Sequence, residues 1–512
     1  MTDASRPSDS TDTPEAADSG RAARAERVRF APSPTGYLHV GGLRTALYNY
    51  LIARQSGGAF VLRIEDTDRE RFVEGAEDDL VSMLRWAGIG HDEGPDVGGP
   101  GGPYRQSERT ARYRAAADRL VADGHAYLAF DTREEIEAAR ASAEATGGAF
   151  AYDARTRAAM RNATSLPASE VARLLDAGAE HVVRLRVDPG ERIAFVDEIR
   201  GEVSFPSGDI DDQVLVKSDG QPTYHLANVV DDHAMGITLV VRGEEWLPST
   251  PKHVLLYRAL GYAPPRFAHL PLLLSPKGGK LSKRNADREG IPVSVRDYRA
   301  AGFEPEALVN FLALLGWNPG DDREAFTLDE LVTAFSLDRV NNTGARFDID
   351  KLRWMNAAAV RALSPEDIAD RAREAVSERV GVVETSHVVA AAALMRERLV
   401  FARDLADAAY LFADPETYDE TGVRKRWKPE SARLVRAYAD RLAALDPFDA
   451  PSAETALRDL AEAEGVGVGA IVHAVRLAVT GTTVGAGLFE TIEVVGQGAS
   501  VRRIARAADV LG

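Results

Sequence analysis

Apolar positions near the start of the chain follow two different periods. Residues 28–31 and 59–64 are short, mostly apolar stretches, each with one arginine, and predict strands. Apolar residues recur at helical spacing over residues 43–51 and again over residues 76–87. A turn rich in proline and glycine, residues 32–36, separates the first strand from the first helix. The order strand, helix, strand and helix predicts a parallel sheet with crossover helices.

The middle of the chain interrupts this pattern and then resumes it. Residues 98–103 are all glycine or proline and predict a loop, and residues 127–187, rich in Ala, Arg and Glu, predict a mostly helical insertion. Residues 237–241 predict a further strand. A helix is expected to begin at Ser249-Thr250-Pro251, because a hydroxyl cap precedes a proline in the first turn, and to end at Gly261.

From about Lys351 to the end, helical periodicity continues without a convincing strand, which predicts an all-α module. The first residues are poor in large apolar side chains and predict a disordered tail. The sequence thus predicts a tail at residues 1–26, the first half of an α/β domain at 27–125, an inserted domain at 126–217, the second half at 218–350 and a helical module at 351–512.

Composition limits the class of protein. A chain of 512 residues is long enough for several domains, and its complete lack of cysteine excludes disulfides and thiolate ligands. The first residues have neither the basic start nor the apolar stretch of a secretory signal. The most apolar run, residues 308–317, is too short to cross a bilayer. We therefore expect a cytoplasmic protein that does not enter a membrane.

The formal net charge of −17 argues against a nucleic-acid binder, which usually has a basic surface. Net charge describes the average field, however, whereas binding depends on local patches. One basic cluster stands out and contains an aromatic residue: Arg424, Lys425, Arg426, Trp427 and Lys428. By itself, such a cluster is more typical of a solvated surface.

The loop after the first expected strand is the first candidate site. It runs from Arg29 to Gly42 and reads Arg-Phe-Ala-Pro-Ser-Pro-Thr-Gly-Tyr-Leu-His-Val-Gly-Gly. Open α/β sheets bind ligands at the carboxyl ends of their strands, and a helix that begins near Gly42 would offer free amides to an anion. His39 could donate a hydrogen bond to a phosphate oxygen. Taken alone, a glycine-rich loop more often serves only as a turn.

A second candidate site is the cationic loop Lys280-Leu281-Ser282-Lys283-Arg284, which is preceded by Lys277 and two glycines. A mobile cationic loop can close over a triphosphate and stabilise the charge that builds on departing pyrophosphate. The simpler interpretation is again an exposed basic loop.

The two loops together resemble the paired signatures of class I aminoacyl-tRNA synthetases. Within that class, the chain is similar to the glutamyl-tRNA synthetase family in four segments: residues 29–42, 63–68 (Arg-Ile-Glu-Asp-Thr-Asp), 219–233 and 242–250. The resemblance extends from about Arg27 to Gly512 and is weaker in the insertion and after Asn356. It implies a Rossmann-like α/β catalytic domain with an inserted, acceptor-binding connective domain, followed by an all-α anticodon-binding module.

The resemblance implies a reaction in two steps. L-glutamate attacks ATP to give glutamyl-adenylate and pyrophosphate, and the 3′ end of tRNA(Glu), or also of tRNA(Gln), then accepts the glutamyl group. Neither step needs a covalent enzyme intermediate, so positioning and charge stabilisation can supply the catalysis. Mg²⁺ would bridge the ATP phosphates. A monomer is the default state in this family.

The residues that match the family's motifs fall into two sets. The implied ATP-binding residues, of which His39, Lys280 and Lys283 would be catalytic, are His39, Gly41, Gly42, Glu245, Leu273, Lys280, Leu281, Ser282, Lys283 and Arg284. The implied glutamate-binding residues are Arg29, Ala31, Ser33, Glu65, Tyr224, Asn228 and Arg242. Arg29 and Arg242 are the candidates to bind the side-chain carboxylate, because a guanidinium group can bind a carboxylate with two parallel hydrogen bonds. Glu65 would bind the ammonium group.

The chain departs from the general patterns at a few positions. Gly42 replaces the second histidine of the class signature, as it often does in glutamyl enzymes. The cysteines that hold zinc in many family members correspond here to Ala129, Asp131 and Thr156, so we expect no structural zinc. Asp231 and Asp232 look like a metal pair, but the resemblance implies no metal there, because the family has the same pair without a metal, and we expect them to cap or order the edge of the sheet.

Four alternatives to a tRNA(Glu)-specific enzyme fit the sequence to different degrees. A non-discriminating enzyme that also charges tRNA(Gln) stays open, because the discriminating side chains of the helical module are not recognisable in one sequence. A glutaminyl enzyme fits less well, since that family binds the anticodon with β-barrels. A short paralogue that modifies a tRNA base is excluded by length. An inactive tRNA-binding paralogue is disfavoured because His39, Gly41, Lys280 and Lys283 are all present.

Within a tRNA-binding module, the cluster of residues 424–428 becomes a candidate contact near the anticodon. Its cations would contact phosphates, and its aromatic residue, Trp427, would stack on an unpaired base.

Overall fold

The computed structural model describes residues 25–68, 70–281, 288 and 290–512. Most of the predicted tail, residues 1–24, lies outside the described residues. Glu26, which the sequence assigned to that tail, belongs to the folded part. Its carboxylate accepts a hydrogen bond from the Thr238 hydroxyl at 2.6 Å and forms an ion pair with Arg266.

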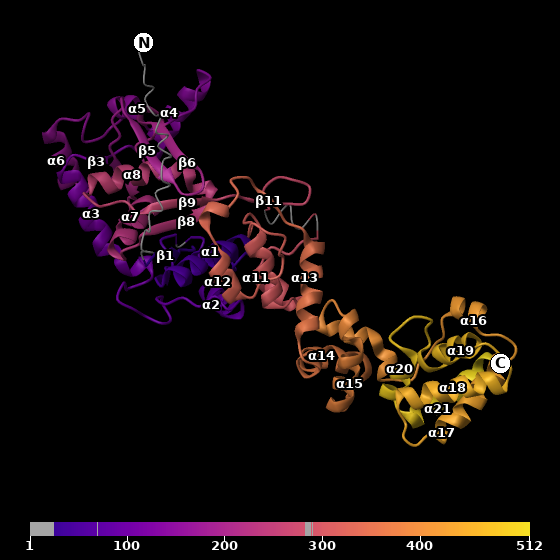
Figure 1. Ribbon diagram of the computed structural model, residues 1–512. Helices are drawn as coiled ribbons and strands as arrows, with labels where there is room; N and C mark the ends of the chain where they lie inside the picture. Colours follow the sequence, from indigo (N-terminus) through magenta and orange to yellow (C-terminus); the bar gives the residue numbers. More distant parts are fainter. Residues whose placement is uncertain (1–24, 69, 282–287, 289) are drawn as a thin grey trace, which may run out of the picture.

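Parallel strands form the centre of the first part of the chain, as predicted (Figure 1). Strands β1 (Arg27–Phe30) and β2 (Ala59–Leu62) pair in parallel. A second sheet has the order β6-β5-β9-β8, in which β8 (Leu239–Gly243) and β9 (Arg266–Leu270) are parallel. The Thr238 N–H, just before β8, donates to the Arg27 carbonyl at 2.8 Å and joins the two sheets.

Four helices complete this part at the positions where apolar residues recur with helical spacing: α1 (Val40–Ser56), α2 (Ala76–Trp86), α7 (Tyr224–Ala234) and α8 (Thr250–Ala259). Ser249 is the N-cap residue of α8, as predicted, but its side chain makes no capping hydrogen bond, because a 3-10 turn, η3 (Glu244–Ser249), runs directly into α8. Pro251 lies in the first turn of α8 as predicted.

The segment predicted as a mostly helical insertion contains more strand than expected. Its strands β3 (Ala126–Ala129) and β4 (Val182–Leu185) form an antiparallel sheet with β7 (Val214–Val216). The helices there are α3 (Thr110–Ala122), just before it, α4 (Arg133–Ala145), α5 (Ala154–Ala159) and α6 (Ala168–Asp176). Short strands of mixed composition have weak periodicity, which explains why the sequence did not reveal them.

Strands β5 (Arg192–Asp197) and β6 (Gly201–Pro206) also lie within the range predicted for the inserted domain. They pair with each other, and β5 joins β9 in parallel through Asp197 and Phe267. This part of the segment therefore extends the sheet that contains β8 and β9, and Asp197 pairs with Phe267 near the start of β9.

The buried carboxylate of Asp212 holds the inserted segment together. It accepts hydrogen bonds from the Tyr127 hydroxyl (2.6 Å), from Nη1 of Arg157 (2.8 Å) and from the Val187 N–H (2.9 Å). Burial raises the pKa of Asp212 more than these donors lower it. Asp131 accepts hydrogen bonds from the Tyr152 hydroxyl and the Arg161 N–H, both at 2.6 Å.

A helical region connects the α/β part of the chain to the C-terminal module. It begins after β10 (Leu273–Leu274), which pairs in parallel with β11 (Ala345–Arg346), a strand that lies later in the chain, between the last two helices of this region. Its helices are α10 (Val295–Ala300), α11 (Pro305–Leu314), α12 (Leu328–Ala334) and α13 (Ile349–Ala362). Helix α11 shares one hydrophobic core with α1 and α13, through Leu308, Leu47 and Leu352 among others.

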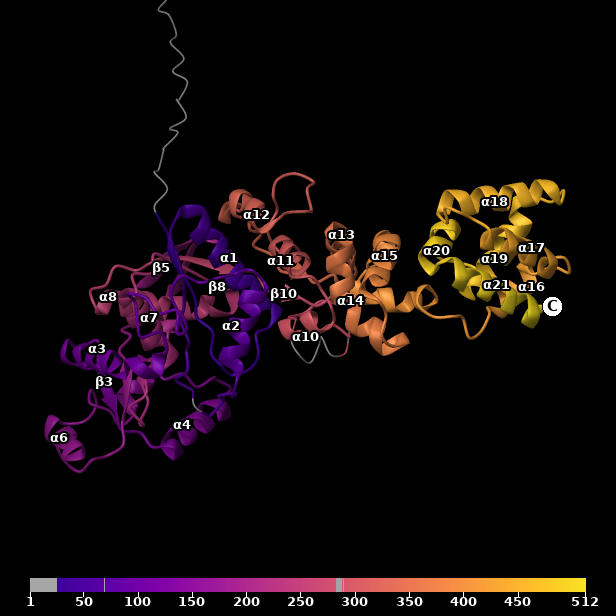
Figure 2. The ribbon, with the colours of Figure 1, turned by 90° about the horizontal axis from the view of Figure 1, so that it is seen from below.

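The C-terminal module is all-α, as predicted. Its helices are α14 (Pro365–Val380), α15 (Thr385–Met395), α16 (Glu420–Arg426), α17 (Ser431–Ala443), α18 (Ala450–Ala463), α19 (Val468–Thr480), α20 (Leu488–Val495) and α21 (Gln497–Leu511). They enclose a separate hydrophobic core. Both views show an elongated molecule, with α4 and α6 towards one end and α16–α21 at the other (Figures 1 and 2). Among the described residues, no helix has the length and apolar character to cross a membrane.

Candidate active site

A cleft of about 1030 Å³ opens at the carboxyl ends of β1, β2 and β8. It brings together most of the residues that the sequence placed in the site: Arg29, Ala31, Ser33, His39, Gly41, Gly42, Glu65, Tyr224, Arg242, Glu245, Leu273, Lys280 and Leu281. Asn228 does not line the cleft, which corrects its predicted place in the polar lining. Ser282, Lys283 and Arg284 lie outside the described residues.

The first loop ends in a helix that begins at Val40, two residues earlier than expected. His39 is the N-cap, and its Nδ1 accepts a hydrogen bond from the Gly42 N–H at 3.0 Å. The Val40 N–H donates to the Val293 carbonyl at 2.9 Å. The amide of Gly42 is therefore engaged, and among the described residues only the Gly41 amide of this turn lacks an acceptor. Because Nδ1 accepts, the ring proton of neutral His39 is on Nε2.

The glycines of this loop have a packing role. A Cβ on Gly41 would lie 3.1 Å from Cε1 and Nδ1 of His39, and a Cβ on Gly42 would lie 3.1 Å from Cδ1 of Leu38. Glycine thus lets the imidazole fold back over the first turn of α1. This local reason adds to the close approach of a ligand that the sequence suggested.

On the facing wall, a short β-turn positions Lys280. The Leu281 N–H donates to the Leu273 carbonyl at 2.7 Å, and the Ser275 N–H donates to the Gly279 carbonyl at 2.9 Å. Nζ of Lys280 lies 3.6 Å from Oε1 of Glu245, and both side chains are about half exposed. Two predicted ATP-binding residues from distant segments therefore form an ion pair in the cleft.

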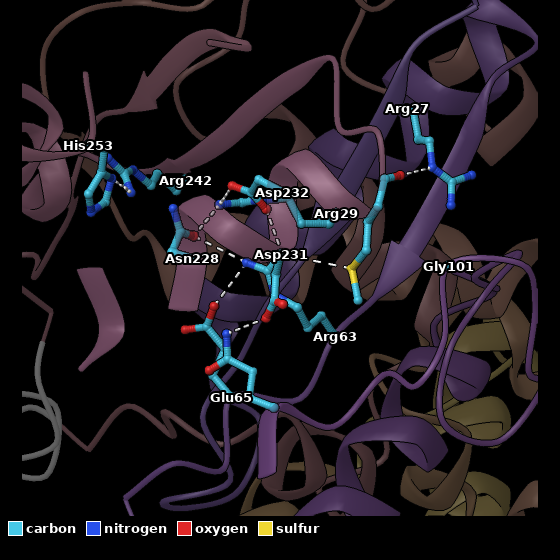
Figure 3. Close-up of polar contacts among 12 residues, drawn as sticks. Arg27, Arg29, Arg63, Glu65, Gly101, Asn228, Asp231, Asp232, Arg242 and His253 are labelled. Carbon is cyan, nitrogen blue, oxygen red and sulfur yellow. Dashed lines mark hydrogen bonds and ion pairs between the residues drawn. The ribbon is translucent and has the colours of Figure 1, made fainter. Parts of the chain in front are cut away.

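A buried group of arginines and acids lies behind the first loop (Figure 3). Arg29 on β1 donates from Nε to Oδ1 of Asp232 at 3.0 Å, and Nη1 of Arg63, just after β2, donates to the same oxygen at 2.6 Å. The Asn228 side-chain oxygen accepts from Nη2 of both arginines at 3.1 Å. Nη2 of Arg63 also donates to Oε1 of Glu65 at 3.1 Å.

The two acids of this group have opposite pKa shifts. Burial acts to raise the pKa of Asp232, but Arg29 and Arg63 together outweigh it and hold the pKa below its usual range. Burial raises the pKa of Glu65 more than Arg63 and Arg29 lower it. Glu65 is therefore the acid of this group that is more easily protonated.

Asp231 and Asp232 have different hydrogen-bond partners, which supports the expectation that they order the sheet edge, although Nε of Arg63 also lies 3.9 Å from Oδ2 of Asp231. Asp231 accepts hydrogen bonds from Nε of Arg109 (2.6 Å), Nε2 of Gln106 (2.9 Å) and the Tyr113 hydroxyl (2.7 Å). Asp232 accepts from Arg29 and Arg63. The adjacent carboxylates thus tie α7 to α3 on one side and to β1 and β2 on the other.

Arg242, on β8, is another buried arginine of the site, and its surroundings differ from those of Arg29 and Arg63. Its guanidinium group donates only to neutral acceptors: Nε2 of His269 (3.1 Å), the Tyr224 hydroxyl (2.8 Å), Nδ1 of His253 (3.3 Å), Oγ1 of Thr250 (2.9 Å) and the Trp246 carbonyl (3.4 Å). Among the described residues, no carboxylate forms an ion pair with Arg242.

The histidines beside Arg242 are uncharged. Burial and the neighbouring Arg242 lower the pKa of His253 well below its usual range. His225, whose Nδ1 lies 3.1 Å from Nε2 of His253, has its pKa lowered by burial to about 4. Burial also lowers the pKa of His269, although Asp197 acts in the opposite direction. The positive charge in this corner of the cleft is therefore that of Arg242.

The residues of the basic cluster 424–428 differ in their exposure to solvent. Arg424, Lys425, Arg426 and Lys428 are exposed at the end of α16 and just after it. Trp427 is buried in the core of the helical module, and its indole N–H donates to the Gly512 carbonyl at 3.1 Å. The predicted stacking of Trp427 on a base is therefore wrong, because the ring is already packed against protein.

Comparison with known proteins follows the same division of the chain. The catalytic-domain family of class I tRNA synthetases (E and Q) matches residues 26–354, and an anticodon-binding domain family matches residues 365–508. The glutamate–tRNA ligase of Cytophaga hutchinsonii is 48% identical over 93% of this chain and 96% of its own length. The chain belongs to the glutamate–tRNA ligase family. The ligase of Parabacteroides distasonis is also 48% identical, over 95% of this chain and 99% of its own length.

Solved structures of glutamate–tRNA ligases have the same architecture. A glutamate–tRNA ligase from Elizabethkingia meningosepticum, crystallised with its amino acid, is 42% identical with a TM-score of 0.92, and the match covers 96% of this chain and all of that one. A glutamate–tRNA synthetase from Elizabethkingia anophelis is 41% identical with a TM-score of 0.90 and covers 95% of this chain. The predicted class, fold and family are thus confirmed.

Sequence reasoning for a glutamate–tRNA ligase missed several residues that build the site. Arg63 could have been found, since it directly follows a buried strand and so lies at the ligand-binding edge of the sheet. Thr250 was noted only as part of a helix start and of a family-like segment, and His253 and His269 gave no signal. They contact Arg242 from other elements, and single-sequence patterns do not report such long-range contacts.

Proposed function

We propose that this chain activates L-glutamate with ATP and transfers the glutamyl group to the 3′ end of tRNA(Glu). The observation that supports glutamate as the substrate is the buried guanidinium group of Arg242, which is surrounded by neutral acceptors in the cleft. A buried charge without a counter-charge is costly, so an anionic side chain that enters the cleft gains the full attraction. A neutral glutamine side chain gains much less.

Arg29 and Glu65 would complete the binding of the amino acid. Arg29 uses Nε and Nη2 for Asp232 and Asn228, whereas Nη1 has no hydrogen bond among the described residues and can donate to a substrate carboxylate. Glu65 lines the cleft and would accept from the α-ammonium group. Asn228 supports this site from behind, because it fixes Arg29 and Arg63. Ala31, Ser33 and Tyr224 form the adjoining surface.

The ATP phosphates would lie between the first turn of α1 and the Lys280 loop. His39 would donate from Nε2, and the amide of Gly41 would point at the same anion. Lys280 would stabilise the developing pyrophosphate charge together with Lys283. Glu245 and Leu273 would contact ribose and adenine, with Mg²⁺ bound through the phosphates. Ser282 and Arg284 belong to the same proposed loop.

Other properties of the proposed ligase rest on the sequence. We propose that the protein is a cytoplasmic monomer. We also propose that it holds no structural zinc, because Ala129, Asp131 and Thr156 occupy the positions of the cysteines in zinc-containing relatives. Metal analysis after dialysis should find no stoichiometric zinc.

The direct test is ATP-dependent attachment of labelled glutamate to two purified tRNAs, the glutamate and the glutamine acceptors. Charging of tRNA(Glu) alone supports a discriminating ligase. Charging of both tRNAs supports the same reaction in a non-discriminating ligase that also accepts tRNA(Gln). If folded protein charges neither tRNA, the proposed activity is wrong and the inactive tRNA-binding alternative gains support.

Replacing Lys280 with methionine should lower ATP–pyrophosphate exchange, measured with tRNA present, by about a hundredfold, because a cation that stabilises the leaving group is lost. KM for glutamate should change little. Lys277→Met is the matched control: Lys277 is exposed on the same turn but does not line the cleft. Equal effects of the two substitutions would contradict the role of Lys280.

Replacing both Arg424 and Arg426 with alanine should raise KM for tRNA and make its dependence on salt less steep by about two units. Neither arginine forms an ion pair among the described residues, so both charges are available to phosphates. The control is Arg433→Ala with Arg436→Ala, since these arginines already pair with Glu464 and Asp509 on the same module. Unchanged tRNA kinetics in the first variant would contradict the contact.

A further inference from the structure

The guanidinium group of Arg242 is oriented by side chains that do not line the cleft. Nε donates to Nε2 of His269 at 3.1 Å, and Nη2 donates to Oγ1 of Thr250 at 2.9 Å. Both partners are fully buried, and neither belongs to the cleft lining. Two hydrogen bonds on one edge fix the rotation of the planar guanidinium group, and its remaining nitrogen, Nη1, meets the Tyr224 hydroxyl in the cleft at 2.8 Å.

Asp197 determines which nitrogen of His269 bears the proton. Oδ2 of Asp197 lies 2.6 Å from Nδ1 of His269, and its Oδ1 accepts from the N–H groups of Ile199 and Arg200, both at 3.1 Å. Burial acts to raise the pKa of Asp197, but His269 and the backbone donors hold it below its usual range. An ionised carboxylate accepts hydrogen bonds only, so Nδ1 of His269 must donate and Nε2 presents a lone pair.

The contact between His269 and Arg242 requires this tautomer. Nε of Arg242 has one hydrogen atom and no lone pair, so it can only donate. If Nε2 of His269 carried a proton, two N–H groups would face each other at 3.1 Å in a buried site. The hydroxyl of Thr250, 3.2 Å from the same Nε2, can adapt as donor or acceptor, but the guanidinium group cannot.

We propose that Asp197 and His269 are positioning residues for recognition of the substrate's side-chain carboxylate. Asp197 fixes the Nδ1–H tautomer of His269, and the Nε2 lone pair then holds Arg242 in the orientation that binds the carboxylate. The inference rests on the proposed binding of glutamate by Arg242. Asp197 is the last residue of β5, so the segment that the sequence assigned to the inserted domain contributes to substrate recognition.

The first test is Asp197→Asn, which keeps the shape of the side chain. The asparagine oxygen can still accept from the Ile199 and Arg200 N–H groups while its amide donates to Nδ1 of His269. The imidazole proton then moves to Nε2, against Arg242. KM for glutamate should rise about ten- to a hundredfold, as for the loss of a hydrogen bond to a charged group. KM for ATP should stay the same, and the preference for glutamate over glutamine should fall.

A second variant separates positioning from general damage to the fold. In His269→Gln, the side-chain oxygen can occupy the position of Nε2 and accept from Arg242 whatever residue stands at 197. The double variant Asp197→Asn/His269→Gln should therefore have a lower KM for glutamate than Asp197→Asn alone. The double variant Asp197→Asn/His269→Ala should not show this decrease in KM for glutamate, because alanine has no acceptor for Arg242. His233→Gln is the control, since this exposed histidine stacks on Tyr262 and should leave KM unchanged.

The outcomes distinguish this inference from the proposed function. If the unmodified chain charges no tRNA with glutamate, the proposed function fails. If it charges tRNA and Asp197→Asn leaves KM for glutamate unchanged, or raises KM for ATP equally, the positioning role is wrong. Should Asp197→Asn fold poorly by circular dichroism, the comparison of His269→Gln with His269→Ala decides: equal glutamate KM values overturn the inference.

Discussion

Replacing Asp232 with asparagine should lower the free energy of unfolding by about 3–5 kcal/mol. Asp232 is 1% exposed and is the shared partner of Arg29 and Arg63, which are themselves buried. An asparagine fits the space but leaves two guanidinium groups without this negative charge. Urea-induced unfolding, followed by tryptophan fluorescence, measures the change.

The destabilisation by Asp232→Asn should depend on pH in one direction. The pKa of Asp232 is held below its usual range, so its carboxylate stabilises the fold at every pH above the unfolded-state value of about 3.9. This stabilisation is lost as the pH falls from that value through the folded-state pKa, and the variant and the unmodified chain should then converge.

A matched control for this prediction is Asp350→Asn. The Asp350 side chain is 84% exposed and, among the residues that the structure describes, forms an ion pair only with Arg353 one helical turn away, so its removal should change stability by less than about 0.5 kcal/mol. A loss of less than 1 kcal/mol in Asp232→Asn would show that the buried arginines do not depend on this carboxylate.

Replacing Arg242 with alanine should lower kcat/KM for glutamate by about a thousandfold, since truncating one partner of a buried charge pair costs about 2–5 kcal/mol. KM for ATP should change little, because the predicted phosphate contacts come from the first turn of α1 and the Lys280 loop. Initial rates of tRNA charging at varied glutamate and fixed ATP measure the effect.

Two further variants make the Arg242 prediction specific. Arg242→Lys keeps the charge but cannot bind a carboxylate with two parallel bonds, so its loss should be intermediate. Arg266→Ala removes a partly exposed arginine on the neighbouring strand β9 that pairs with Glu26 and Glu198, and it should leave glutamate kinetics intact. Equal kcat/KM for Arg242→Ala and the unmodified chain would show that the carboxylate binds elsewhere.

Local patterns predicted much of the fold. The mostly apolar stretches at residues 28–31 and 59–64 became β1 and β2, and the periodic stretch at residues 76–87 became α2. The helical module after Lys351 was also correct. Each of these elements is encoded by neighbouring residues, which is why periodicity reveals it. The strands of the inserted segment are short and irregular in composition, and their pairing partners are distant in sequence.

The sequence predicted the cleft residues that belong to a motif on a single loop. It predicted less well the residues that come together from distant segments. The loop with His39 and the turn with Lys280 line one cleft, as the sequence suggested. Asn228 was placed in the lining on the basis of its motif, but its oxygen is used by Arg29 and Arg63. Trp427 was placed on the surface by its basic neighbours, but its ring faces the core of the helical module.

The sequence by itself determined the class of reaction, the periodic elements and the residue types available to bind ATP and glutamate, because these depend on local order along the chain. Only the tertiary structure decided which charges are neutralised. Arg29 and Arg63 meet Asp232 from α7, whereas Arg242 meets His269 and Thr250 and no carboxylate among the described residues. In a buried site the energy of a charge is set by what surrounds it, and those neighbours come from segments far apart in the sequence.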